Sequence, residues 1–231
     1  ASLLQNTISR LGTIGGSLPP IIVVGEDHRF ITKSQIDELE LGQEYTILLE
    51  PVGRNTAPAI AGAVEYVSRV RSDTDLTLLI LPADHLISDV PAFNEAVATA
   101  AQKAAAGAIV TFGIEPQKAE TGYGYIQIGS LVAEAAHQVA AFVEKPDLDT
   151  AQGYLTDGGF LWNSGMFAWR AIDLLAEVRR QLPLLFDGIG VIGGFILGSD
   201  SDTRDIFRKT IDFVFDSEID GCQFTIMTPF P

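Results

Sequence analysis

Short apolar runs alternate with amphipathic segments along the first half of the chain. The runs are almost wholly apolar and end at turn residues: 20–25, 46–50, 76–81 and 108–112. Such runs are typical of strands buried on both faces. The segments between them repeat their apolar residues with the period of a helix: 27–41, 56–71 and 91–106. This alternation predicts a parallel, doubly wound α/β sheet.

The first residues predict one more helix. Ser2 and Gln5 have the spacing of a capping box, and Leu3, Ile8 and Leu11 fall on one helical face. Because a chain rarely begins at the first turn of a helix, we expect a segment before it.

The pattern changes after residue 120. Segments 122–128 and 137–144 predict strands joined without a helix, which would add an antiparallel portion to the sheet. Residues 147–155 and 170–182 predict helices, and 160–169 is an apolar run with a polar centre. The second half therefore predicts a mixed sheet rather than a purely parallel one.

A further change comes after about residue 186. A glycine-studded strand at 188–198, a helix at 203–215 and a strand at 223–227 predict a βαβ unit. We expect two parts, a domain over 1–186 and a tail segment of different origin over 187–231.

The composition favours a protein with a packed core and argues against nucleic-acid binding and membrane insertion. The 231 residues are 47% hydrophobic and 19% charged, which is enough apolar material for a packed core. The net charge of -15 argues against nucleic-acid binding, because an acidic surface repels phosphates. A single cysteine, Cys222, excludes an intrachain disulfide. No apolar run predicts a membrane span and no signal peptide is visible, so we expect a cytoplasmic protein.

Polar residues that could bind a ligand or take part in a reaction follow the predicted strands. Asp84 comes just past the strand at 76–81, where open α/β sheets bind ligands, and its carboxylate suits Mg²⁺ held between phosphates. A role as a turn cap is equally compatible with the pattern. After the strand at 46–50, Arg54 offers a guanidinium fork for phosphate, whereas Asn55 or Thr56 more simply caps the next helix.

Three later segments add candidates. Gly122 and Gly124 would let a backbone approach a ligand, although a hairpin entry also explains them. Glu144 and Lys145 suit a sugar hydroxyl and a phosphate, or form a solvated pair. Asn163 belongs to a polar Asn-Ser-Gly inside an apolar run, which needs a partner from ligand or backbone.

Taken in order, these segments resemble mannose-1-phosphate guanylyltransferases, including the guanylyltransferase half of bifunctional bacterial enzymes. The matching segments are 50–60, 81–87, 121–126, 142–146 and 162–167. The resemblance covers about residues 1–186. It implies a Rossmann-like nucleotidyltransferase fold of the GT-A-like type, with a mixed sheet flanked by helices. It also implies the reaction of GTP with mannose 1-phosphate to give GDP-mannose and pyrophosphate, with Mg²⁺ as cofactor.

The resemblance also implies roles for matching positions. Asp84 would hold the catalytic Mg²⁺, Glu144 would accept hydrogen bonds from sugar hydroxyls, and Lys145 would neutralise the sugar phosphate. Three residues would line the mannose pocket: Gly122, Tyr123 and Asn163. Four residues would lie on the nucleotide side: Glu50, Pro51, Arg54 and Asn55.

The chain departs from this family pattern in two places. The first strand and the glycine-rich loop that wraps the GTP phosphates are absent, and so is a Gly-x-Trp-x-Asp-x-Gly-x-Trp segment that supplies a second metal-binding aspartate. The tail instead resembles part of a radical S-adenosylmethionine enzyme barrel, without the Cys-x₃-Cys-x₂-Cys motif of an iron–sulfur cluster. A truncated or chimeric remnant that binds sugar phosphate or nucleotide weakly is therefore the alternative to an active enzyme. The sequence leaves open whether the chain forms a homo-oligomer.

Overall fold

The fold is described from a computed structural model, which places residues 1–41, 44–50, 56–70, 76–133, 136–181, 195–197 and 224–226. These residues form two compact units. The first comprises Ala1–Pro20, Ser34–Gln43 and Asp75–Asp173, and the second comprises Ile21–Lys33, Glu44–Thr74 and Leu174–Pro231. Within the described residues, no helix has both the length and the apolar character needed to cross a membrane.

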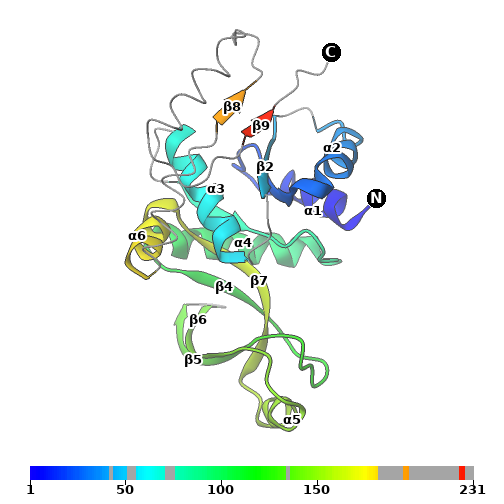
Figure 1. The fold of residues 1–231 in the computed structure, drawn as a ribbon. Helices are drawn as coiled ribbons and strands as arrows, with labels where there is room; N and C mark the ends of the chain where they lie inside the picture. Colours follow the sequence, from blue (N-terminus) through cyan, green and yellow to red (C-terminus); the bar gives the residue numbers. More distant parts are fainter. Residues whose placement is uncertain are drawn as a thin grey trace. The chain divides into compact units, whose positions relative to one another are not determined.

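The first unit contains a five-stranded sheet, shown in the lower part of Figure 1. Its strands are β3 (Thr77–Ile80), β4 (Val110–Ile114), β5 (Tyr125–Ala133), β6 (Ala136–Val143) and β7 (Phe160–Arg170). The order is β3-β7-β5-β6, with β4 on the other edge of β7. All of its strand pairs are antiparallel.

The long strand β7 corrects the expectation of a parallel sheet here. The βαβ unit β3-α4-β4 forms as predicted, with α4 at Val90–Ala105. However, β3 and β4 do not pair with each other, because β7 lies between them and runs antiparallel to both. The long apolar run of β7 supplies partners for both of its edges, so the pairs of this sheet are all antiparallel, and the parallel pair β1–β2 lies in the second unit.

Helix α4 covers one face of this sheet (Figure 1). Phe93 and Val97 pack with Met166 of β7, and Ala100 and Ala104 pack with Ala168. The small alanines let the helix approach the sheet closely. The helix begins where Asp89 Oδ1 accepts a hydrogen bond from Ala92 N at 3.0 Å, and it ends before Gly107, whose φ is +92°.

Helix α1 (Leu3–Leu11) confirms the predicted capping box. Ser2 Oγ accepts from Gln5 N at 3.1 Å, and Ser2 N donates to Gln5 Oε1 at 2.8 Å. Gln5 also donates to Gln35 O and to Glu38 Oε2, both at 2.9 Å. These bonds tie α1 to the segment that ends α2 (Arg29–Asp37). The helix expected over 27–41 is thus shorter, and a 3₁₀ turn, η1 (Glu26–His28), precedes it.

The second unit holds the parallel pair that the sequence predicts. β1 (Ile21–Gly25) pairs with β2 (Thr46–Glu50) in parallel, and α3 (Thr56–Val70) contacts β1. Every residue of both strands is half-buried rather than fully buried. Among the described residues this sheet has two strands.

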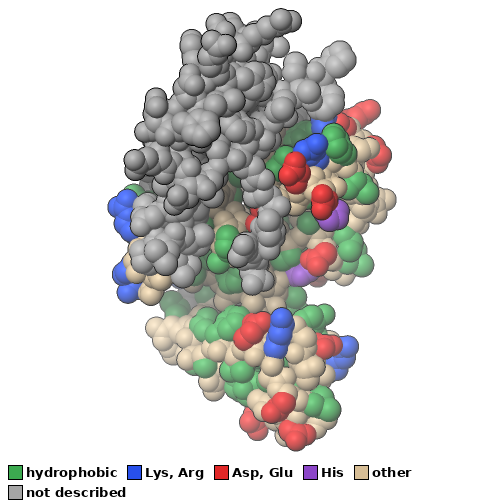
Figure 2. Space-filling model, viewed as in Figure 1, with side chains coloured by type: hydrophobic (Ala, Val, Ile, Leu, Met, Phe, Trp, Pro, Cys, Tyr) green, Lys and Arg blue, Asp and Glu red, His purple; other side chains and the backbone are tan. Residues whose placement is uncertain are grey.

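The remaining elements are α5 (Leu148–Asp157), α6 (Ala171–Gln181) and a short parallel pair, β8 (Phe195–Leu197) with β9 (Phe224–Ile226). The βαβ tail over 187–231 stays a prediction. The helix expected at 203–215 lies outside the described residues. On the face seen in Figure 2, acidic, basic and hydrophobic side chains of the described residues are interspersed.

Candidate functional site

Strands β5 and β6 of the first unit end beside the part of β7 that carries Asn163, which brings candidate residues into one row. Tyr125 of β5 pairs with Trp162 of β7 on one side and with Val143 of β6 on the other. The next positions along are therefore Gly124, flanked by Asn163 and Glu144. Asn163 N donates to Gly124 O at 2.8 Å, which fixes one side of this row. Segments separated by twenty to forty residues in the sequence meet here through strand pairing.

A side chain at Gly124 would crowd two side chains of the neighbouring segment, Glu144 and Phe142. A Cβ on it would lie 2.9 Å from Glu144 Oε2 and 3.2 Å from the ring of Phe142. The carboxylate of Glu144 thus lies against the bare backbone of Gly124. Glycine at this position permits the close approach, and a larger residue would make the flexible Glu144 side chain move.

Asn163 uses its carbonyl oxygen for structure. Oδ1 accepts hydrogen bonds from Thr111 Oγ1 and from Gly165 N, both at 3.2 Å. Among the described residues no acceptor bonds its Nδ2. The two Nδ2 protons are therefore available for an acceptor on a ligand.

Ser164, the buried polar residue next to Asn163, has backbone partners for its hydroxyl. Its Oγ donates to Phe112 O at 2.7 Å and accepts from Met166 N at 3.1 Å, and the residue is buried. Its partners are backbone groups across an irregularity in the β4–β7 pairing. Gly165 has φ of +71°, which re-aims the strand at this point.

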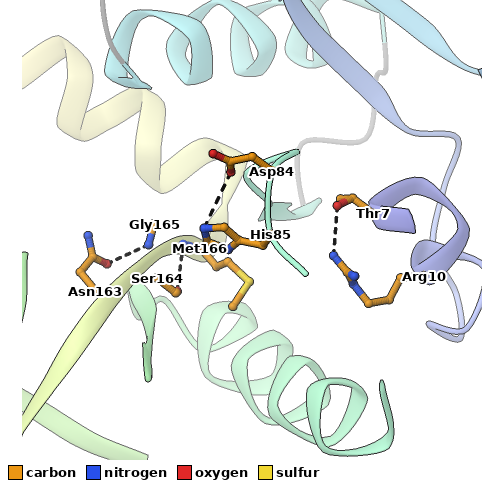
Figure 3. A network of polar contacts seen from close by, with 8 residues as sticks. All are labelled: Thr7, Arg10, Asp84, His85, Asn163, Ser164, Gly165 and Met166. Atoms are coloured by element: carbon orange, nitrogen blue, oxygen red, sulfur yellow. Dashed lines mark hydrogen bonds and ion pairs between the residues drawn. The ribbon is translucent and has the colours of Figure 1, made fainter. Parts of the chain in front are cut away.

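Asp84 lies in the loop that follows β3, next to this irregular part of β7 (Figure 3). A Cβ on Gly165 would be 3.4 Å from Pro82 Cγ, so the loop passes close to the strand. The Asp84 side chain is 81% exposed, and its Oδ1 is 3.8 Å from His85 Nε2. No backbone N–H of the described residues bonds this carboxylate, so no turn cap is seen and the carboxylate is open to a cation.

Lys145 and Tyr123 border the same row. Lys145 has φ of +44°, and its Nζ is 3.7 Å from Glu144 Oε1, with both side chains largely exposed. Non-glycine residues in this left-handed region concentrate at functional sites. Tyr123 is half-exposed and meets Trp162 edge to face, at 5.4 Å between ring centroids. Gly122 lies beside it, and its N–H donates to Glu120 Oε1 at 3.2 Å.

The nucleotide-side candidates are placed less completely. Glu50 is the last residue of β2, in the second unit, where it pairs with Gly25. Pro51, Arg54 and Asn55 lie outside the described residues. Their contribution stays a prediction.

Two residues near the row were not singled out from the sequence. Thr111 reaches Asn163 from β4, across 52 positions in the sequence, and no local signal announces such a contact. Glu120 is the second. Its carboxylate lies 3.0 Å from Lys118 Nζ, and the lysine, with the Gly122 N–H, lowers the pKa of Glu120. The same pairing raises the pKa of Lys118, so both groups are charged at neutral pH.

A buried cation elsewhere in this unit has a structural explanation. Arg10 of α1 is 5% exposed, and burial lowers its pKa. Its Nη2 donates to Thr7 Oγ1 at 3.1 Å (Figure 3), and its guanidinium lies 5.2 Å from the ring centroid of Phe93. An aromatic face and a hydroxyl hold the charge here, which joins α1 to α4.

The described residues contain no group of three or more His, Cys, Asp or Glu side chains arranged to hold a metal ion. Mg²⁺ is nevertheless often bound through one or two carboxylates, with waters and substrate phosphates completing its shell. An exposed carboxylate such as that of Asp84 fits this mode.

Comparison with known proteins identifies the family. The family model of nucleotidyl transferases matches residues 1–188 of this chain. This chain belongs to the nucleotidyl transferase family. It is 47% identical over 185 residues to mannose-1-phosphate guanylyltransferase RfbM of Salmonella typhimurium, covering 80% of this chain and 38% of the relative. It is 44% identical over 217 residues to a mannose-1-phosphate guanylyltransferase of Escherichia coli, covering 91% of this chain and 45% of the relative.

A solved structure of similar fold is called mannose-6-phosphate isomerase, from Helicobacter pylori. It has a TM-score of 0.72 and 32% identity, over 83% of this chain and 70% of that one. The chain spans less than half the length of the curated relatives named above. The family and the nucleotidyltransferase-like fold expected from the sequence are thus confirmed.

Proposed function

We propose that this chain belongs to a mannose-1-phosphate guanylyltransferase, which transfers GMP from GTP to mannose 1-phosphate and releases pyrophosphate. The observation that carries the proposal is the row of Asn163, Gly124 and Glu144, with Lys145 at its end and the Asp84 loop next to β7. The relatives named as guanylyltransferases support the choice of substrates. GTP and mannose 1-phosphate are the proposed partners.

The residues of the row carry polar groups that are proposed to bind the sugar phosphate. The Glu144 carboxylate accepts hydrogen bonds from sugar hydroxyls, and the Nδ2 protons of Asn163 donate to a sugar oxygen. The Lys145 ammonium offsets the charge of the sugar phosphate. Gly122 and Tyr123 border the sugar. Glu50, Pro51, Arg54 and Asn55 are proposed to lie along the nucleotide.

The chemical step is an in-line displacement at the α-phosphorus of GTP. An oxygen of the sugar phosphate forms the new P–O bond while the bond to the pyrophosphate oxygen breaks. Little covalent work is required of the protein, so holding the two anions in line and offsetting their charge supplies the rate. Asp84 is proposed to hold Mg²⁺, which when bound would neutralise charge on the phosphates.

The alternative is a remnant that binds sugar phosphate or nucleotide weakly without turnover. The observation behind it is that the match to the nucleotidyl transferase family ends at residue 188 of 231. A cytoplasmic location also remains a prediction.

Pyrophosphate release from GTP and mannose 1-phosphate, with and without Mg²⁺, tests the proposal. We expect release that depends on Mg²⁺ and that Asp84→Asn lowers by about 100-fold or more, as for loss of one preorganised electrostatic group. Glu95→Gln, which neutralises an exposed carboxylate on α4, is the matched control and should leave the rate unchanged. Glucose 1-phosphate in place of mannose 1-phosphate tests the choice of sugar.

The outcomes separate the two readings. Equal rates for Asp84→Asn and the parent chain would remove Asp84 from the proposal. Binding of mannose 1-phosphate by calorimetry without turnover would favour the remnant. Neither binding nor turnover would reject both.

A further inference from the structure

The carboxylate of Glu120 contacts the loop before β5, in addition to the bond from Asn163 N to Gly124 O. Glu120 Oε1 accepts from Gly122 N at 3.2 Å, and Glu120 Oε2 lies 3.0 Å from Lys118 Nζ. The Glu120 side chain is 27% exposed, whereas Lys118 is 70% exposed. Residues 121–124 belong to no helix or strand, so this carboxylate supplies order that no regular element provides.

The hydroxyl of a buried tyrosine, Tyr125, also holds Glu120 in place. The backbone N–H of Glu120 donates to Tyr125 Oη at 3.0 Å, and Tyr125 is fully buried. Its ring lies 5.3 Å from that of Tyr154 on α5, which stacks on Phe160 at 3.9 Å. Since these rings pack between α5 and the sheet, Tyr125 has little freedom to move and fixes the position of Glu120.

The bond from Gly122 determines how the loop can face a ligand. Its N–H is occupied by Glu120, so a contact from Gly122 to a sugar hydroxyl has to come from its carbonyl oxygen. The next residue, Tyr123, leans its ring against Trp162. One continuous series of contacts thus runs from Tyr125 through Glu120 to Gly122 and Tyr123.

We propose that Glu120 is a positioning residue of the sugar site, which orders residues 121–124 so that the Gly122 carbonyl and the Tyr123 ring face the sugar. This inference rests on the proposed function for its ligand, but not for the order of the loop. Glu120 touches no reacting atom. Its effect is on sugar-phosphate binding rather than on nucleotide binding.

The test combines three variants of the whole chain with two measurements. Glu120→Ala removes both contacts of the carboxylate, Glu120→Gln keeps an oxygen that can accept from Gly122 N, and Lys118→Met removes the ion pair alone. Calorimetry measures binding of mannose 1-phosphate and, separately, of GTP. Amide exchange by ¹⁵N NMR measures protection of the Gly122 N–H.

We expect Glu120→Ala to weaken mannose 1-phosphate about tenfold, the factor that corresponds to one net hydrogen bond, and to leave GTP unaffected. Gly122 should lose its protection in this variant. Glu120→Gln should retain part of both, and Lys118→Met should change binding by less than about threefold, as for an exposed pair.

Two results would overturn the inference. One is unchanged Gly122 protection in Glu120→Ala, which can be read whether or not the sugar phosphate binds. The other is tighter binding by Glu120→Ala, which would mean that the carboxylate competes with the ligand for the Gly122 N–H. A parent chain that binds no mannose 1-phosphate would count against the proposed function, while the exchange data still decide the role of Glu120.

Discussion

At the scale of single residues, the candidate site depends on the absence of a side chain at Gly124. Its bare backbone lets the Glu144 carboxylate and the Asn163 amide approach from opposite sides, one on each neighbouring strand. A specific prediction follows, because a side chain at this position would displace the Glu144 carboxylate, which is proposed to bind the sugar.

Gly124→Ala should weaken mannose 1-phosphate binding while leaving the fold intact. The new Cβ would lie 2.9 Å from Glu144 Oε2, so the carboxylate has to move. We expect a loss of about tenfold or more in affinity, the cost of one displaced hydrogen-bonding group, measured by calorimetry alongside a circular dichroism melt.

Gly153→Ala is the control for this variant. It lies within α5, and a Cβ there meets nothing within 4 Å. It should raise the free energy of unfolding by about 0.5–1 kcal/mol, because alanine favours helix, and leave binding unchanged. Equal binding by Gly124→Ala and the parent chain would show that Glu144 does not contact the sugar.

At the scale of elements, helix α4 packs on β7, the strand that carries part of the candidate site. Three alanines meet there: Ala100, Ala104 and Ala168. The same strand carries Asn163, Ser164 and Gly165 a few residues earlier, so the position of the helix and that of the site are coupled through β7.

Ala104→Leu should therefore destabilise the first unit. Ala104 is fully buried, and the extra methyl groups would push α4 away from Ala168. We expect a loss of about 1–3 kcal/mol in the free energy of unfolding, measured by urea denaturation. Ala98→Leu, at an exposed position of the same helix, should change it by less than about 0.5 kcal/mol. A similar stability for both variants would contradict the packing described here.

At the scale of the whole molecule, charge is the main constraint. A net charge of -15 would repel GTP, the proposed substrate and itself a polyanion, so its binding would need local cations or a metal to offset the repulsion. The pairs Lys145–Glu144 and Lys118–Glu120 show that two of the lysines of the first unit are themselves next to carboxylates.

This balance predicts how salt acts on GTP binding. With Mg²⁺ removed by a chelator, raising the ionic strength to the physiological range should strengthen GTP binding, because salt screens repulsion between like charges. With saturating Mg²⁺ the dependence should become weaker or reverse. Fluorescence titration with a labelled GTP analogue at several salt concentrations measures both. Binding that weakens with salt in the absence of metal would point to a cationic site that dominates the overall charge.

Local pattern was sufficient for most elements. The capping box at Ser2, the helix that starts at Thr56 and the strand before Asp84 all follow from signals within a few residues of each other, so the sequence predicted them. It also placed Glu144, Lys145 and Asn163 at strand ends or within a strand, and the family resemblance put them in one site.

What the sequence determined by itself was therefore the elements, the family and the candidate residues, because caps, apolar periods and motifs are read along the chain. Only the tertiary structure decided that β7 separates β3 from β4, that Ser164 bonds backbone while Asn163 keeps free donors, and that Glu120 holds the Gly122 loop. These facts depend on which strands pair and in what register. Pairing joins residues tens of positions apart, and no local signal specifies it.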